Sequence, residues 1–296
     1  MKGIILAGGN GTRLHPVTLS TCKQLLPVYD KPMIYYPLST LISADIKDIL
    51  IIATPHDVPR FTNIFGNGSE LGLNITYHIQ SEPRGIADAL ILGKSFIDND
   101  PVCLILGDNI FFGANFETML FQASTKATMS VCSIFGYYVD NPCRYGVLEF
   151  DSALNKVIAI AEKPEYPKSN YVVTGLYFFP EGVSEIAEQV TPSKRGELEI
   201  TDVLNWYLNN GTLSTTLNVQ LLGRGFAWLD TGTHESLLDA GNFISTIEKR
   251  QGLKIGCIEE AAYKSGFIDH TQLLRIALRL KNTNYGSYLL RIANEF

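Results

Sequence analysis

A group of glycines with hydroxyl and cationic neighbours lies near the start of the chain. Gly8, Gly9 and Gly11 are followed directly by Thr12 and Arg13. Glycines let the backbone approach a ligand closely, and consecutive N–H groups at the end of a strand bind anions. A plain tight turn would use the same glycines, but Arg13 adds a guanidinium that can stabilise charge on a phosphoryl group. The pattern predicts a phosphate cradle.

A second cation, Lys23, follows ten residues after Arg13. A single lysine is usually a solvated surface charge, whereas two cations beside a glycine loop favour an anion site. The spacing G-G-x-G-T-R matches neither the Gly-Lys-Ser/Thr ending of a P-loop nor the G-x-G-x-x-G dinucleotide fingerprint. The loop therefore points to phosphate chemistry of another kind.

Two aspartates, Asp108 and Asp230, each follow a short apolar run that reads as a strand. Each could cap a turn. Carboxylates that emerge at the same edge of a sheet also suit Mg²⁺, which takes a few protein oxygens together with water and substrate phosphates. The sequence leaves both interpretations open.

Two further segments place polar groups at predicted strand ends. Glu162 and Lys163 stand before a proline, where an exposed ion pair and a ligand-binding pair are both consistent with the sequence. Gln80 ends another strand, and its amide can satisfy the donor–acceptor edge of a pyrimidine. Gly85, shortly after it, would leave room for a flat ring.

Short apolar runs typical of strands alternate with helix-like segments through the first half of the chain. This pattern predicts an α/β fold with a doubly wound, mostly parallel, Rossmann-like sheet that positions these residues. The expected strands are 3–7, 48–53, 75–79, 102–106 and 129–135. The expected helices are 32–44, 58–65, 85–96 and 116–124.

The second half of the chain has a different pattern. Strands are expected at 146–150, 156–161, 171–179 and 226–229, and a helix at 199–208. The remainder, 234–296, is mainly helical, and its apolar faces are large enough to pack on the sheet or on another subunit.

Composition limits the classes of function. The formal net charge is −6 and no Lys/Arg run is present, so nucleic-acid binding is not expected. No segment has the length of a membrane span or the form of a leader, which predicts a cytoplasmic protein without membrane association. The five cysteines are scattered, without a C-x-x-C pair, and fit a reducing compartment.

The ordered motifs resemble the glucose-1-phosphate thymidylyltransferase branch of the sugar nucleotidyltransferase family. L-A-G-G-x-G-T-R-L is followed by K-Q-L-L-P-V-Y-D-K-P-M-I-Y-Y-P-L-S-T-L, and later by L-G-D-N, R-Y-G-V, E-K-P, G-E-L-E-I-T-D-V and W-L-D-T-G-T. The resemblance runs through essentially the whole chain. It implies a single domain over 1–296, with a nucleotide-binding part at 1–140, a sugar-phosphate-binding part at 141–233 and a helical region with oligomer contacts at 234–296.

The resemblance also implies a reaction, the transfer of a thymidylyl group from dTTP to glucose 1-phosphate. The products would be dTDP-glucose and pyrophosphate, in the first step of dTDP-sugar (for example dTDP-rhamnose) biosynthesis. Further implications are a Mg²⁺ cofactor, a homotetramer, and a dTDP-sugar feedback inhibitor at a second site.

Residue roles follow from the resemblance at matching positions. The implied catalytic residues are Arg13, Lys23 and Lys163, and the metal ligands Asp108 and Asp230. The implied nucleotide-binding residues are Leu6, Gly8, Gly9, Gly11, Thr12, Arg13, Gln80, Gly85 and Asp108. The implied sugar-phosphate-binding residues are Tyr145, Gly146, Glu162, Lys163, Val173, Thr174 and Tyr177.

One segment departs from the usual pattern of this branch, Q-P-S-P-D-G-L-A-Q-A-F. The chain has Arg84 in place of an acid and Asp88 in place of a glutamine, beside the expected base pocket. Two rival functions are an oxidoreductase, which the glycine spacing opposes, and a non-catalytic nucleotide-sugar sensor. Such a sensor would have lost the loop arginine or a metal-site aspartate, and this chain retains them.

Overall fold

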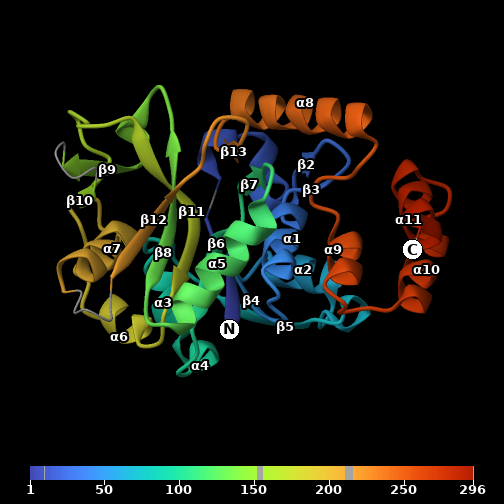
Figure 1. The fold of residues 1–296 in the computed structure, drawn as a ribbon, viewed down its shortest axis with the longest axis horizontal. Helices are drawn as coiled ribbons and strands as arrows, with labels where there is room; N and C mark the ends of the chain where they lie inside the picture. The colour runs from blue at the N-terminus through green and yellow to red at the C-terminus, as the bar shows by residue number, and fades with distance from the viewer. Residues whose placement is uncertain (10, 152–155, 211–215, 296) are drawn as a thin grey trace.

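The computed structural model describes residues 1–9, 11–151, 156–210 and 216–295. Within them, a nine-stranded sheet runs through the centre in the order β10-β9-β11-β6-β1-β4-β5, with β8 and β12 attached beside β11 (Figure 1). The strands are β1 (Lys2–Leu6), β4 (Asp48–Ala53), β5 (Asn74–Ile79), β6 (Val102–Leu106), β8 (Cys132–Tyr138), β9 (Gly146–Asp151), β10 (Lys156–Glu162), β11 (Tyr171–Phe179) and β12 (Leu217–Leu221).

One half of the sheet is parallel and the other is mixed. Strands β6, β1, β4 and β5 run parallel to one another, with Ile5 of β1 opposite both Ile51 and Ile105. Strand β11 is antiparallel to both β6 and β8. The predicted α/β class with a large, mostly parallel sheet is confirmed.

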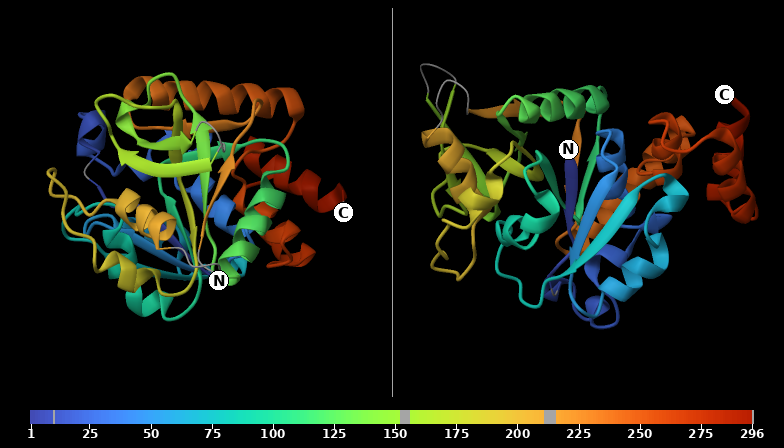
Figure 2. Two further views of the ribbon diagram at one scale, coloured as in Figure 1. Left: turned by 60° about the vertical axis from the view of Figure 1, so that its left-hand side comes forward. Right: turned by 90° about the horizontal axis from the view of Figure 1, so that it is seen from below.

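Both faces of the sheet are covered, because successive side chains of a buried strand point to opposite faces. In β1, Ile4 and Ile5 are both fully buried, yet they belong to separate apolar clusters. The helices that share the apolar cluster of Ile5 are α1 (Tyr35–Ser43), α2 (Val58–Phe65), α5 (Phe116–Thr128), α9 (Ile258–Lys264), α10 (His270–Arg279) and α11 (Asn284–Glu295), of which the last two pack on α9. Those on the Ile4 face are α3 (Asp88–Leu92), α4 (Lys94–Ile97), α6 (Val183–Ala187) and α7 (Ile200–Asn209). Figure 2 shows α6 and α7 on the opposite side of the molecule from the C-terminal helices.

A third apolar cluster lies at the edge of the sheet where the strand ends and the glycine loop meet. Two small antiparallel ribbons, β2 (Pro27–Val28) with β3 (Lys31–Pro32) and β7 (Asn109–Phe112) with β13 (Ala227–Asp230), pack there under α8 (His234–Gln251). A capping box at Thr233 begins α8. Helix α8 therefore covers the ribbons that follow the strand ends (Figure 1).

Most predicted elements occur within a few residues of their expected bounds, and two differ for physical reasons. The expected helix 85–96 begins only at Asp88, because Gly85 has φ +109°, and it is interrupted at Gly93, where a Cβ would lie 2.8 Å from Ile4. The expected strand 129–135 begins at Cys132, because α5 continues to Thr128. The sequence did not predict strands β2, β3, β7 and β12 or helix α6.

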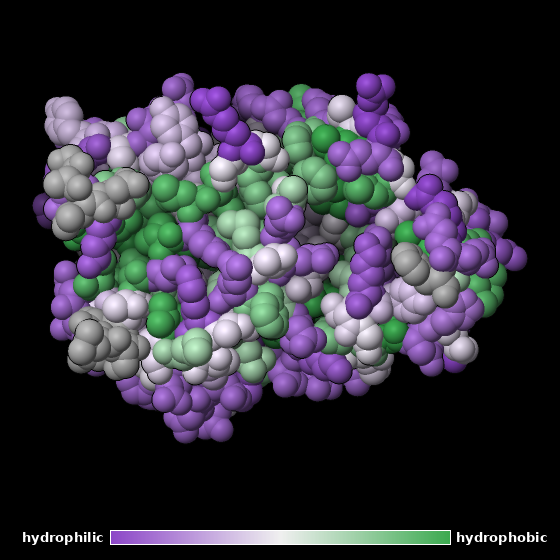
Figure 3. All heavy atoms as spheres, in the orientation of Figure 1, coloured by the Kyte–Doolittle hydropathy of each residue, from purple (hydrophilic) through white to green (hydrophobic). Residues whose placement is uncertain are grey.

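The surface is mixed on the face seen in Figure 3. Hydrophilic side chains cover the tip around α4 and most of the C-terminal helices, while apolar ones gather over the sheet at the left. Among the described residues, no helix combines the length and the apolar character needed to cross a membrane.

Candidate active site

The glycine loop lies directly after β1 and borders a cavity of about 260 Å³. Gly9 and Gly11 have φ of +124° and +56°, which glycine adopts without the strain that other residues suffer. Arg13 is exposed on the short helix Thr12–Leu14. The cavity is lined by Gly8, Gly9, Gly11, Thr12, Arg13, Leu14, Lys23, Gln24, Asp108 and Gly232. Asn10 of the loop lies outside the described residues.

Lys23 and Asp108 form an ion pair across this cavity. The Lys23 side chain is 8% exposed and that of Asp108 24% exposed, and the other carboxylate oxygen of Asp108 accepts a 2.8 Å hydrogen bond from Asn109 Nδ2. Burial on its own would raise the pKa of Asp108. The Lys23 ammonium and the two hydrogen bonds outweigh it and hold the pKa below its usual range.

Asp230 is brought beside Asp108 by the pairing of β13 with β7. In that ribbon Asp230 stands opposite Asn109, the residue after Asp108. Asn109 Oδ1 also accepts hydrogen bonds from Trp228 Nε1 at 2.6 Å and from the Gly175 backbone at 3.1 Å. Strands β7, β11 and β13 thus meet at one amide.

Arg13 completes this group of charges. An added Cβ on Gly232 would lie 3.0 Å from Asp230 Oδ1 and 3.4 Å from the guanidinium of Arg13, so this glycine allows the two to converge. Tyr145 donates a 3.2 Å hydrogen bond to Asp230 Oδ2. Burial, and next the Asp230 charge, raise the pKa of Tyr145 to about 12, so the phenol stays a donor at neutral pH.

A second cavity of about 480 Å³ adjoins the first, and Arg13 and Asp108 line both. Its lining includes the predicted residues Tyr145, Gly146, Glu162, Lys163, Val173, Thr174, Tyr177 and Asp230. Within the part of the chain that the structure describes, the buried hydroxyls of Thr174 and Thr201 have no hydrogen-bond partner. Both residues line this cavity, so a polar ligand would satisfy them.

Glu162 and Lys163 lie at the mouth of the larger cavity. Lys163 has φ +41°, which is rare for a residue with a side chain, and its backbone N–H bonds to Tyr145 O at 3.0 Å. The Glu162 carboxylate lies 3.4 Å from Lys163 Nζ and 3.1 Å from Arg195 Nη2. The two residues form the ion pair that the sequence allowed, and both also line the cavity that a ligand could enter.

Of the predicted base-binding residues, Gln80 lies against the glycine loop and Gly85 lies against Leu198. Gln80 is 5% exposed, and its Oε1 fills the space that a Cβ on Gly8 would need. The Cβ direction of Gly85 faces the Leu198 backbone, and its expected role of leaving room for a base stays a prediction. A Cβ there would lie 2.6 Å from Leu198 N and 2.9 Å from Leu198 C, so this glycine permits close packing of two backbone segments.

The structure therefore brings the predicted metal, phosphate and sugar residues to two adjoining cavities. Leu6, Gln80 and Gly85 line neither of them among the described residues, although Gln80 contacts Gly8. Sequence reasoning missed Arg195, which pairs with Glu162 and with Glu199 at 2.7 Å. A lone arginine within the run K-R-G-E-L-E was the available signal.

Residues 2–247 match the family described as nucleotidyl transferase. A glucose-1-phosphate thymidylyltransferase of Mycolicibacterium smegmatis is 54% identical over 295 residues, covering 100% of both chains, and one of Neisseria meningitidis is 52% identical with the same coverage.

Two solved structures have a fold similar to that of this chain. A structure from Bacillus anthracis, assigned as a glucose-1-phosphate thymidylyltransferase and holding a sucrose, has a TM-score of 0.73 at 41% identity, over 82% of this chain and 94% of its own. A UDP-glucose pyrophosphorylase with bound UDP-glucose has a TM-score of 0.71 at 23% identity, over 84% of this chain and 99% of its own. The second likeness is one of fold.

Proposed function

The chain belongs to the nucleotidyl transferase family and, within it, to the glucose-1-phosphate thymidylyltransferases, and we propose that it makes dTDP-glucose and pyrophosphate from dTTP and glucose 1-phosphate. In this reaction an oxygen of the sugar phosphate forms a bond to the α-phosphorus of dTTP. The bond from that phosphorus to the bridging oxygen of the β-phosphate breaks, and pyrophosphate leaves with the electron pair.

The observation that carries the proposal is the pair of adjoining cavities that share Arg13 and Asp108. The smaller one, with its glycine backbone and Lys23, suits a triphosphate, while the larger one suits a sugar phosphate. The α-phosphorus would then lie at their junction, next to Arg13. A guanidinium at that point stabilises the charge that develops during transfer.

The acceptor needs no general base, because an ionised phosphate oxygen is already a nucleophile at neutral pH. The task of the protein is alignment and the neutralisation of two anions that repel each other. We assign Lys163 to the phosphate of the sugar and Lys23 to the triphosphate or the leaving pyrophosphate. Glu162 accepts hydrogen bonds from sugar hydroxyls, and Thr174 supplies its unpaired hydroxyl.

The donor set at the junction fits a divalent cation. Asp108 and Asp230 come together through the β7–β13 ribbon, and Mg²⁺ favours one or two carboxylates completed by water and phosphate oxygens. When bound by these two residues, Mg²⁺ would neutralise charge on the reacting phosphates.

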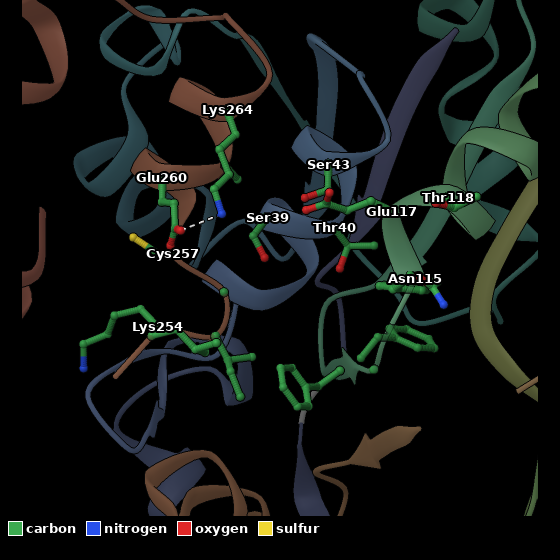
Figure 4. Close-up of a pocket in the computed structure, with 18 residues that line it drawn as sticks. Ser39, Thr40, Ser43, Asn115, Glu117, Thr118, Lys254, Cys257, Glu260 and Lys264 are labelled. Carbon is green, nitrogen blue, oxygen red and sulfur yellow. Dashed lines mark ion pairs between the residues drawn. The ribbon is translucent and has the colours of Figure 1, made fainter. Parts of the chain in front are cut away.

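A separate cavity of about 500 Å³ supports feedback by a dTDP-sugar. It lies between α1, α5 and α9, away from the two described above. In Figure 4, Lys264 and Glu260 of α9 face each other beside Ser39 of α1, and an ion pair of 2.8 Å joins the lysine to the glutamate. A cation, hydroxyl groups and aromatic side chains in the lining suit a nucleoside diphosphate, so we assign the inhibitor to this cavity.

Family membership also supports a homotetramer and a place in dTDP-sugar biosynthesis, such as the route to dTDP-rhamnose. Light scattering of the purified protein measures the first: a particle mass other than four chains contradicts it. A cytoplasmic location stays a prediction.

The test of the reaction is release of pyrophosphate from dTTP, UTP, CTP, ATP and GTP in the presence of glucose 1-phosphate. We expect dTTP to be preferred, and Arg13→Ala and Asp108→Asn each to lower turnover about 100- to 1000-fold while the protein stays folded. Arg275→Ala, which removes an exposed arginine on α10, is the matched control. Turnover of either site variant at the level of this control, or preference for a purine triphosphate, contradicts the assignment.

A further inference from the structure

The side-chain amide of Gln80 has a buried charged partner. Its Nε2 donates a 2.9 Å hydrogen bond to Asp88 Oδ2 from the first turn of α3. Gln80 is 5% exposed and Asp88 1% exposed, so water does not compete for this contact. Burying an aspartate costs free energy unless its carboxylate is paired, so the partners of Asp88 indicate its role.

The chemistry of the pair determines which way the amide points. A carboxylate accepts hydrogen bonds and donates none, so only the NH₂ group of Gln80 can face Asp88. The carbonyl oxygen is then directed to the opposite side, where it lies against Gly8. An amide or hydroxyl in place of Asp88 could both donate and accept, and would leave both orientations of Gln80 available.

Arg84 supports the charge of Asp88. Its Nη1 lies 3.8 Å from Asp88 Oδ1, which has no hydrogen-bond partner among the described residues. The guanidinium therefore supplies the opposite charge that a buried carboxylate needs. Arg84 thus pairs with Asp88, and Asp88 accepts the hydrogen bond that orients the side-chain amide of Gln80.

We propose that Asp88 is a positioning residue that fixes Gln80 as a hydrogen-bond acceptor and so excludes cytosine nucleotides. The inference rests on the proposed function and on the expected role of Gln80 in binding the nucleotide base. Thymine and uracil present an N3–H donor to a fixed acceptor. Cytosine presents a lone pair at the same position, so two acceptors would face each other in a buried place.

The experiment compares kcat/KM for dTTP, dUTP and dCTP, which share one sugar and differ only in the base. Asp88→Asn keeps the shape and lets Gln80 rotate. We expect the dTTP/dCTP ratio to fall by about 10-fold or more, since one buried mispaired hydrogen bond is worth about that factor. The dTTP/dUTP ratio should stay constant, because thymine and uracil present the same N3–H donor to Gln80 and differ only in the 5-methyl group.

Glu82→Gln is the matched control, because it changes a carboxylate to an amide at an exposed position of the same segment. Its ratios should equal those of the wild type. Equal loss for all three nucleotides in Asp88→Asn, or no change in the dTTP/dCTP ratio, overturns the proposal. Absence of pyrophosphate release by the wild type with every nucleotide refutes the proposed function instead.

A second variant keeps the test open if Asp88→Asn does not fold. Arg84 is mostly exposed, and Arg84→Gln removes the charge that supports Asp88 without opening a cavity. It should lower the dTTP/dCTP ratio in the same direction. An unchanged ratio in this variant also overturns the proposal.

Discussion

Replacement of Lys23 by methionine tests the charge balance at the centre of the site. The ammonium is 8% exposed and is paired with Asp108, which is 24% exposed. Removing one partner of a fully buried pair costs about 3–5 kcal/mol, and the partial exposure of Asp108 reduces this to about 2–4 kcal/mol of unfolding free energy. Urea titration near neutral pH measures it.

The same variant has a pH signature whose sign follows from the pKa of Asp108. In the wild type the pKa of Asp108 lies below that of a free aspartate. The carboxylate therefore stabilises the fold at pH values above the free pKa, and this stability is lost as the pH falls through the lower pKa of the folded protein. Without Lys23, only the Asn109 and backbone hydrogen bonds still oppose the effect of burial, so the pKa of Asp108 rises. The difference in stability between the two proteins is therefore largest near neutral pH and shrinks as Asp108 becomes protonated.

The control for this prediction is Lys168→Met, which breaks a 2.7 Å ion pair with Glu149. Lys168 is 71% exposed, so the loss should be about 1 kcal/mol or less. The double variant Lys23→Met with Asp108→Asn should recover part of the stability, since no charge is left buried without a partner. A loss in Lys23→Met that equals the control, or that is independent of pH, refutes the reasoning.

Two further predictions concern a glycine and the separate cavity. Gly85→Ala should lower the free energy of unfolding by about 3 kcal/mol in thermal or urea unfolding, because φ is +109° and the added Cβ meets the Leu198 backbone. The control Gly182→Ala, at φ +82° in open space, should lower it by about 1 kcal/mol. Equal losses in the two variants contradict the close packing at Gly85. Lys264→Ala should weaken inhibition by a dTDP-sugar at fixed dTTP about 10-fold, as expected for one charge-assisted hydrogen bond. The surface variant Lys281→Ala should leave inhibition unchanged, and an unaltered inhibition curve in Lys264→Ala removes the inhibitor from that cavity.

The parts of the fold that could be predicted are those whose signal is local. The buried strand 48–53 and the helix 58–65 have the predicted bounds, because each depends on its own apolar spacing. The four-residue strand β7 was missed, since it has no sheet neighbour close in sequence and exists through its pairing with β13. Pairing across such a distance cannot be read from periodicity.

The candidate site divides in the same way. The glycine loop and the aspartates after strands could be found from residue types, because they stand at strand ends. The partners could not: nothing local indicates that Asn109 joins Gly175 to Trp228, or that Gln80 faces Asp88. The expectation that Gly85 leaves room for a base stays a prediction, because a missing Cβ does not by itself say which neighbour uses the space.

The β7–β13 ribbon has a consequence for the chain while it is still being made. Trp228 and Asn109 are hydrogen-bonded although 119 positions separate them. A chain that leaves the ribosome can complete the glycine loop, Lys23 and Asp108 long before β13 emerges, and closing so long a loop comes late in folding. The second carboxylate, Asp230, arrives with that strand, so an unfinished chain holds a phosphate cradle without the group that completes the junction. Catalytic competence is therefore tied to synthesis of nearly the whole sheet.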